Sequence, residues 1–451
     1  MYLLLAFALW LMPTIAEASC HGASPTWTST VERSSVASCV TQAQAGDTIN
    51  VLAGNETWST PITVNKGIRI IGAGPGLTVI TRGGSSIFVI SDPSNVSLTR
   101  ISGFTFLVSS GFEGGGISLQ CSDIPPNKYK IRIDNNLFTP SGSCTTGHCY
   151  IKNNGCRGVI DNNTFEGAPY PLGVGLAGDF PGGVAWQNLP QLEFGRPHDN
   201  IYVEDNVLNG ISMAVTDCDE GGRYAFRYNN ITGTQVYPFL DSHGGKGGVY
   251  SCMGVEIYAN KFIGDGFVHA NQYAARGIFH HNYTTGDGEL HIRDGDGCPV
   301  LEHERMNSTY YFLNRTNGTS GGLMPLSFGN MISCGHTITP NVDFWVDNQS
   351  CIAPNTCSKI PIGVGAGKLD NRPAQCTPGT AYWATTKSTT SLTGMSGVNP
   401  TSPISGTLYR CTSPNTWTAF YTPFTYPHPL RAWSSMDDAP AAPTDLRVIS
   451  R

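Results

Sequence analysis

Short blocks that alternate apolar and polar residues and then reach an asparagine recur along the middle of the chain. The blocks read IRIDNNLF (131–138), GVIDNNTF (158–165), IYVEDNVL (201–208), FRYNNIT (226–232), VEIYANKF (255–262) and IFHHNYT (278–284). Their aligned asparagines are Asn136, Asn163, Asn206, Asn230, Asn260 and Asn282, and the series continues more loosely through Asn314 and Asn348. Successive members of the aligned set are 27, 43, 24, 30 and 22 residues apart, and a period of this size predicts a solenoid.

Each repeat reads as strands without an intervening helix, so each predicts one coil of a solenoid built from parallel strands. Neighbouring coils would lie about 4.8 Å apart and share a continuous core. The asparagine side chains would bridge successive coils by hydrogen bonds where the strands bend. Before the first repeat, the segment 35–45 predicts an amphipathic helix that caps the open end, with its apolar face formed by Val36, Cys39, Val40 and Ala43.

The composition excludes several other classes of protein. Charged residues make up only 13% of the chain, whereas 53 glycines and 29 prolines supply many turns. A disordered chain would be richer in charge, and a coiled coil would be poorer in glycine. The net charge of −6 with no basic run gives no indication of nucleic-acid binding.

The first residues predict an exported protein. Residues 1–12 are an apolar run that is too short to span a bilayer, and Ala16-Glu17-Ala18 resembles a cleavage site, so we interpret 1–18 as a signal peptide. No later segment is apolar enough to predict a membrane span. The chain contains 14 cysteines, which in an oxidising compartment would form disulfides. Plausible local pairs are Cys20 with Cys39, Cys351 with Cys357, and Cys376 with Cys411.

The sequence also resembles a known family. The stretch AQAGDTINVLAGNETW, the following IRIIGAG and the repeated D-N-N-x-F blocks resemble secreted right-handed parallel β-helix proteins of the pectin-lyase-like superfamily, over about residues 35–350. The resemblance implies an all-β, right-handed parallel β-helix. It implies no single activity, because the superfamily includes polysaccharide lyases, glycoside hydrolases, carbohydrate epimerases and adhesins. The Arg-x-Pro-x-x-Arg run of the lyases is absent from this sequence.

The expected organisation has four parts. The signal peptide at 1–18 precedes the β-helix at 19–350. A Cys- and aromatic-rich segment at 351–437 predicts a C-terminal cap or a small β module, because two aromatic strands flank a Ser/Thr/Gly-rich turn. A Pro/Ala linker and tail follow at 438–451.

The long spacing between Asn163 and Asn206 places an insert at about 167–198. It contains Phe180, Trp186, Phe194 and Arg196, and loops of this length are often functional. The insert would either wall a sugar-binding groove, with Trp186 as a stacking platform, or pack on its own coil. The sequence favours neither.

Counting forward from each ladder asparagine predicts which side chains share a face. Equal offsets place Asp217, Asp241, Asn271 and Arg293 in one row along the axis, with Asp219 and His243 in a second row and His269 and His291 in a third. We expect Asp217, Asp241, His243 and Arg293 to be catalytic and His269, Asn271, His291 and Trp186 to contact substrate.

Two chemistries fit this face. In the first, Asp217, Asp219 and Asp241 bind Ca²⁺ and with it the carboxylate of an acidic sugar, because Ca²⁺ prefers several carboxylate oxygens. Arg293, His243 or Lys246 then serves proton abstraction, which is lyase chemistry. In the second, Asp217 and Asp241 act as general acid and base in glycoside hydrolysis.

A non-catalytic alternative remains open. Polar rows on a β-helix are often solvated ladders that bind no substrate. The predicted function is therefore a secreted carbohydrate-active protein whose partner is a polysaccharide, either a lyase-like or hydrolase-like enzyme or a glycan-binding adhesin.

Overall fold

The computed structural model describes residues 20–93, 97–109, 115–121, 130–142, 148–175, 193–196, 200–212, 214–218, 221–233, 240–242, 252–264, 267–272, 276–292, 305–328, 332–333, 336–347 and 363–432. The described chain winds into a parallel β-helix, which confirms the predicted fold. Each coil contributes one strand to each of three long sheets, called sheets A, B and C here. The predicted signal peptide, the tail beyond 437 and Asn348 of the ladder lie outside the described residues.

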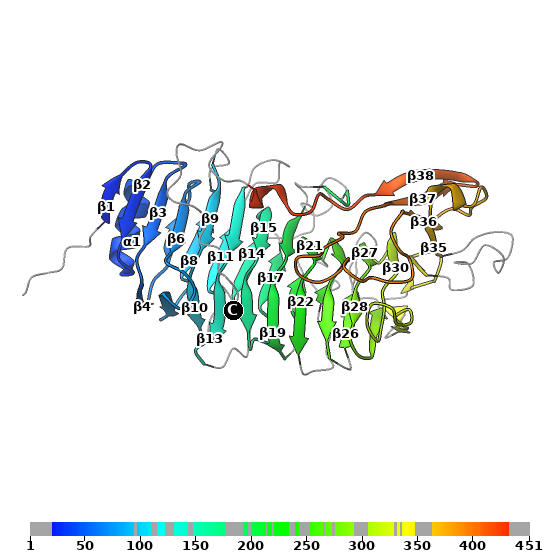
Figure 1. Ribbon diagram of the computed structural model, residues 1–451, viewed down its shortest axis with the longest axis horizontal. Helices are drawn as coiled ribbons and strands as arrows, with labels where there is room; N and C mark the ends of the chain where they lie inside the picture. Colours follow the sequence, from blue (N-terminus) through cyan, green and yellow to red (C-terminus); the bar gives the residue numbers. More distant parts are fainter. Residues whose placement is uncertain are drawn as a thin grey trace, which may run out of the picture.

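Sheet A runs the full length of the solenoid (Figure 1). Its strands are β1 (Cys20–Ala23), β2 (Thr26–Ser29), β3 (Thr48–Val51), β6 (Arg69–Gly72), β9 (Thr99–Ser102), β12 (Ile131–Asp134), β15 (Gly158–Asp161), β18 (Ile201–Glu204), β21 (Arg223–Arg227), β24 (Gly254–Tyr258), β27 (Gly277–His280), β30 (Thr309–Phe312) and β34 (Phe344–Val346). All neighbours pair in parallel except β1 and β2.

Sheets B and C complete each coil. Sheet B contains β4 (Gly54–Trp58), β7 (Thr78–Arg82), β10 (Thr105–Val108), β13 (Leu137–Pro140), β16 (Thr164–Glu166), β19 (Val207–Ile211), β22 (Asn230–Gly233), β25 (Lys261–Ile263) and β28 (Tyr283–Thr284). Sheet C contains β5 (Ile62–Val64), β8 (Phe88–Ser91), β11 (Ile117–Gln120), β14 (Ile151–Asn154), β17 (Leu172–Gly175), β20 (Thr216–Cys218), β23 (Leu240–Ser242), β26 (Phe267–Gln272), β29 (Gly288–Ile292) and β31 (Leu326–Phe328). The two short strands β32 (Ile332–Ser333) and β33 (His336–Thr337) pair in an antiparallel arrangement.

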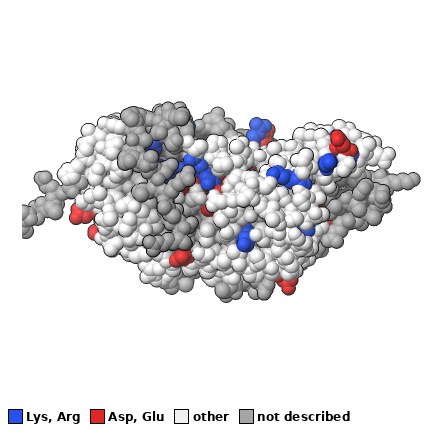
Figure 2. Space-filling model, viewed as in Figure 1, with Lys and Arg blue, Asp and Glu red and all other residues white. Residues whose placement is uncertain are grey.

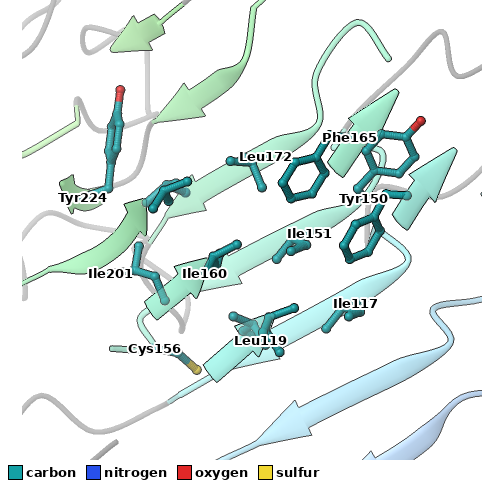
Figure 3. Close-up of a cluster of buried hydrophobic side chains, with 14 of the residues drawn as sticks. Ile117, Leu119, Tyr150, Ile151, Cys156, Ile160, Phe165, Leu172, Ile201 and Tyr224 are labelled. Carbon is teal, nitrogen blue, oxygen red and sulfur yellow. The ribbon is translucent and has the colours of Figure 1, made fainter. Parts of the chain in front are cut away.

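The core is a stack of identical positions from successive coils. In sheet A one inward row consists of Ile49, Ile70, Ile101, Ile133, Ile160, Val203, Phe226, Ile257, Phe279 and Tyr311, all buried. In sheet B, Phe106, Phe138 and Phe165 stack with ring centroids 5.1 and 4.9 Å apart. Figure 3 shows Phe165, Leu172 and Ile160 pointing from different strands into this shared interior. Because one coil cannot bury its apolar face alone, the stacking of coils is what creates the core.

The predicted N-terminal helix is present as α1 (Arg33–Gln42), at the same end of the solenoid as β1 (Figure 1). The four apolar side chains assigned to its inner face are buried as predicted: Val36, Cys39, Val40 and Ala43.

The asparagine ladder lies at the bend between sheets A and B. From Asn163 onward, each Asn accepts, through its side-chain oxygen, hydrogen bonds from the backbone N–H and the side-chain amide of the preceding member, for example 3.0 and 3.1 Å from Asn136 to Asn163. The residue before each Asn has positive φ, as at Tyr228 (φ 56°) and Ala259 (φ 59°). One expected member is wrong, because the ladder continues from Asn206 to Asn229 and not to Asn230. Asn230 instead begins β22 and pairs with Val207.

The segment 363–432, which we call the strap, packs along the outward side of sheet A. It contains β35 (Val364–Gly367), η2 (Leu369–Asn371), β36 (Ala381–Ala384), β37 (Thr407–Ser413), β38 (Thr416–Tyr421) and η3 (Pro429–Arg431). Trp383 and Tyr421 share an aromatic cluster with Tyr258 and Phe312 of sheet A. After β38 the chain runs back toward β15 (Figure 1), where Arg431 reaches Asp161.

Disulfides confirm two of the three predicted pairs, Cys20–Cys39 and Cys376–Cys411. The pairs Cys121–Cys156 and Cys218–Cys252 were not predicted, and the predicted pair at 351 and 357 lies outside the described residues. In the described part of the chain no cysteine is free. Among those residues no helix is long and apolar enough to cross a bilayer.

Candidate functional site

The outward face of sheet C carries the row that contains the predicted acidic residues. Its members, paired strand by strand, are Thr63, Val89, Ser118, Lys152, Gly173, Asp217, Asp241, Asn271, His291 and Ser327. The parallel pairing places Asp217 directly beside Asp241, and Asp241 beside Asn271, as the counting predicts. Neighbouring strands in a sheet lie roughly 4.8 Å apart, so these positions are adjacent at the backbone.

The expected end of this row is wrong. Asn271 pairs with His291 and not with the expected Arg293, and His291 therefore does not share a row with His269. The register shifts between Val268 and Asn271, where β26 holds one residue more than β29. Equal offsets predict stacking only where no such irregularity intervenes. Arg293, Asp219, His243 and Trp186 themselves lie outside the described residues.

The alternation of inward and outward side chains along β20 places Asp217 on the outer surface of sheet C. Its neighbours Thr216 and Cys218 point inward and are fully buried, and Cys218 is anchored to Cys252 by a disulfide. The Asp217 side chain points outward and keeps 19% of its surface exposed. A partly exposed carboxylate on a cross-linked strand can meet a large substrate without the strand moving.

His148 completes this part of the site and was not predicted from the sequence. Its Nδ1 lies 3.9 Å from Oδ2 of Asp217, and its side chain is 13% exposed. The imidazole lies over Gly173, because a Cβ built on Gly173 would fall 2.2 Å from Cγ of His148. Glycine inside a strand often marks such a close approach, so Gly173 is the one signal that could have pointed here.

The row combines charges of both signs. Lys152 is two strands from Asp217 and is partly exposed, and His291 lies beyond Asn271. The charges matter because they are rare in this protein: most of the face in Figure 2 is uncharged, and its Lys and Arg side chains form no continuous patch.

A second group of charges lies on sheet A beneath the strap and is structural. Arg227 and Glu204 are both fully buried and paired, and Arg431 also contacts Glu204. Burial raises the pKa of Glu256 to about 7, although hydrogen bonds from the Gly195 N–H (2.9 Å) and the Asn200 amide (2.8 Å) oppose the rise. The strap covers these groups, so a polymer cannot reach them.

The described residues of the 167–198 insert fall into two parts. Leu172–Gly175 is strand β17 of sheet C, whereas 193–196 lies on the covered side of sheet A. Phe194 is buried and meets Phe420 and Tyr421 of β38 edge to face. It therefore packs on the strap rather than on sheet C. Phe180 and Trp186 lie outside the described residues, so the groove-wall prediction for Trp186 stays a prediction.

Two of the three predicted Ca²⁺ ligands lie in described strands of sheet C. Among the residues that the structure describes, no group of three or more His, Cys, Asp or Glu side chains could hold a metal ion. Asp217 and Asp241 occupy adjacent row positions with oxygen ligands of the type that Ca²⁺ prefers. The donor chemistry of that pair fits Ca²⁺, and the third expected ligand, Asp219, lies outside the described residues.

Comparison with known proteins gives limited information. No protein family model matches the sequence, and no curated protein matches it. Among solved structures, the A-module of the mannuronan C-5 epimerase AlgE6 from Azotobacter vinelandii is similar at 13% identity and a TM-score of 0.24. The similarity covers 67% of this chain and 85% of that one. Similarity at this level carries no information about activity.

Proposed function

We propose that this protein is an extracellular carbohydrate-active enzyme that acts on an acidic polysaccharide along the outward face of sheet C. The observation that carries the proposal is the pairing of Asp217 with Asp241. In a chain with few charges, a solenoid that aligns two aspartates on neighbouring strands beside a histidine provides the kind of groups that proton transfer requires.

The face is also shaped for a polymer. The row extends over many parallel strands, so a chain of sugars can lie along the solenoid axis and contact several coils. Lys152 on one side of the aspartates and His291 on the other supply cationic or hydrogen-bonding groups for the carboxylates of successive sugars. The disulfides support an extracellular location.

Two reactions fit the aspartate pair. In the lyase-like reaction, Asp217 and Asp241, with Asp219, hold the sugar carboxylate together with Ca²⁺, and Arg293, His243 or Lys246 serves the abstraction of the adjacent proton. Bound Ca²⁺ would supply charge neutralisation at that carboxylate. In the hydrolase-like reaction, Asp217 and Asp241 are the acid and the base, and their separation sets whether the sugar configuration is retained or inverted.

The test is an activity screen on acidic and neutral polysaccharides. Lyase activity would appear as the ultraviolet absorbance of an unsaturated product, and hydrolysis as new reducing ends without that absorbance. Asp217→Asn and Asp241→Asn should each reduce turnover to a small residual rate, whereas Asp370→Asn, which alters an exposed strap residue, should leave it unchanged.

A repeat of the screen with chelator and with added Ca²⁺ tests the metal. Loss of activity with chelator and its recovery with Ca²⁺ would support the ion. Binding of a polysaccharide without turnover would replace the enzyme proposal by a glycan-binding protein. Full activity in the Asp217→Asn, Asp241→Asn double variant would remove the site.

A further inference from the structure

We infer that His148 is a positioning residue, which holds the Asp217 carboxylate in place within the outward row of sheet C. The inference rests on the proposed function and deepens it, because it assigns a role to a side chain outside the pattern of the repeat. It depends on three features of the described residues: the position of the imidazole, the gap at Gly173, and the anchoring of the backbone next to His148.

The imidazole of His148 occupies a position in the row where strand β17 provides no side chain. In strand order the row reads Lys152, Gly173 and Asp217. Gly173 contributes no side chain, and the His148 ring lies in the space that one would occupy, with 2.2 Å separating its Cγ from a Cβ built there. The ring therefore occupies the row position that lies between those of Lys152 and Asp217.

The two residues that follow His148 are anchored in the interior of the solenoid. Cys149 is buried and disulfide-bonded. Tyr150 is fully buried, packs against Phe138 and Phe165, and donates its hydroxyl hydrogen to the backbone oxygen of Glu166. Figure 3 shows Tyr150 beside Phe165 in the interior. A side chain on such an anchor loses little entropy when it engages a partner, which is the requirement for preorganisation.

The distance defines what His148 does to Asp217. At 3.9 Å the Nδ1–Oδ2 contact is longer than a hydrogen bond but within the range of an ion pair. Contacts of this kind in a substrate-free site commonly shorten when substrate binds. His148 thus limits the directions in which the Asp217 carboxylate can turn and keeps it facing the neighbouring position of Asp241.

The experiment measures kcat and KM on the polysaccharide identified by the screen. His148→Ala should lower kcat by about 10- to 100-fold, the usual cost of losing a residue that orients a functional group, and should change KM by less than about twofold. His148→Gln, which retains a polar group near Asp217, should recover part of the loss. A structural role alone would not produce this separation of kcat from KM.

Gly173→Ala tests the same geometry without removing the histidine. The added methyl group would displace the ring from the row, so kcat should fall as it does for His148→Ala. Gly322→Ala is the matched control, because a Cβ at Gly322 meets no atom within 4 Å. Thermal unfolding of each variant identifies any that fails to fold.

A double-mutant cycle shows whether His148 acts through Asp217. In the Asp217→Asn background, His148→Ala should lower the residual rate by less than about twofold, because the group it positions is already lost. A wild-type protein that turns over no polysaccharide overturns the proposed function and this role with it. An active wild type whose rate is unaffected by His148→Ala and Gly173→Ala, or additive losses in the cycle, overturns the role of His148 alone.

Discussion

The Arg227 guanidinium and the Glu204 carboxylate form an ion pair on neighbouring strands of sheet A, with both side chains fully shielded from solvent. Nε of Arg227 donates to Oε2 of Glu204 at 2.7 Å, and the same guanidinium donates to the backbone oxygens of Phe424 and Thr425 at 2.6 and 2.9 Å. The backbone N–H of His428 donates to the other carboxylate oxygen at 2.8 Å. This one pair therefore connects the solenoid to the strap.

Removing the charge of Glu204 should destabilise the protein at neutral pH. Burial acts to raise the pKa of Glu204, but Arg227 and Arg431 hold it below its ordinary value. Glu204→Gln leaves Arg227 buried without its counter-ion, which typically costs about 3–5 kcal/mol. The free energy of unfolding in denaturant measures the loss, and Glu56→Gln on the partly exposed strand β4 is the control.

The same substitution has a defined pH dependence. A carboxyl whose folded-state pKa is lowered stabilises the fold above its unfolded pKa, and this contribution disappears as pH falls through the folded value. The difference between Glu204→Gln and wild type should therefore shrink toward acid pH. A difference that stays constant across the acid range would contradict the assigned ion pair.

Glu256 should show the opposite behaviour. Burial raises its pKa from 4.5 to about 7. A carboxyl with a raised folded-state pKa stabilises the fold below its unfolded pKa, and that stability is lost as pH rises through the folded value. Between these two values the wild type should lose stability with rising pH, and Glu256→Gln should not.

The measurement is denaturant unfolding on both sides of that interval. At alkaline pH, Glu256→Gln should be more stable than wild type by at least about 1.4 kcal/mol, the equivalent of one pKa unit. Glu166→Gln, on an exposed position of β16, should follow the wild-type curve. Parallel pH curves for Glu256→Gln and wild type would show that folding does not raise the pKa of Glu256.

Substitution of two adjacent asparagines, Asn229 and Asn230, tests the position of the ladder. Asn229 is fully buried, donates to the backbone oxygens of Val203 and Arg227 at 2.9 Å each, and bonds to Asn260 at 3.0 Å. Asn229→Ala should cost at least about 2–3 kcal/mol of unfolding free energy, because it leaves buried polar groups without partners.

Asn230→Ala is the matched control. Asn230 is partly exposed and its side chain accepts a 3.3 Å hydrogen bond from the Val398 N–H, so its loss should cost less than about 1 kcal/mol. If Asn230→Ala were the more damaging substitution, the ladder would run through the residue expected from the sequence and not through Asn229.

These two residues also show how far the sequence predicts the fold. The period of the blocks was sufficient to predict the solenoid and the ladder, because both depend on local patterns repeated many times. The capping helix was predictable from the amphipathic pattern of its own segment, 35–45. The choice between Asn229 and Asn230 depends on which preceding residue takes positive φ, and Tyr228 is an unusual residue for that conformation. The spacing of the blocks is too irregular to reveal a shift of one residue in the position of the ladder asparagine.

The candidate site was predictable only where successive coils are regular. Asp217, Asp241 and Asn271 stack as expected, whereas the irregularity in β26 moves His291 into the position expected for Arg293. His148 reaches the row from outside the repeat. The strap was still less predictable, since contacts such as that between Glu204 and Arg431 join residues 227 positions apart and have no signature in local pattern.

Two disulfides that close loops of nearly equal length provide a final comparison. Cys218–Cys252 spans 34 residues and holds the strand of Asp217, whereas Cys376–Cys411 spans 35 residues within the strap. Loss of either pair by double Cys→Ser substitution should lower the unfolding free energy by about 4 kcal/mol, if the cross-link acts by restricting the unfolded chain. On the proposed function, only the Cys218→Ser, Cys252→Ser variant should also lose turnover at a temperature where both remain folded. That loss would follow from the freedom that the strand of Asp217 gains relative to Asp241. Equal turnover in the two folded variants would show that the site does not depend on the rigidity of β20.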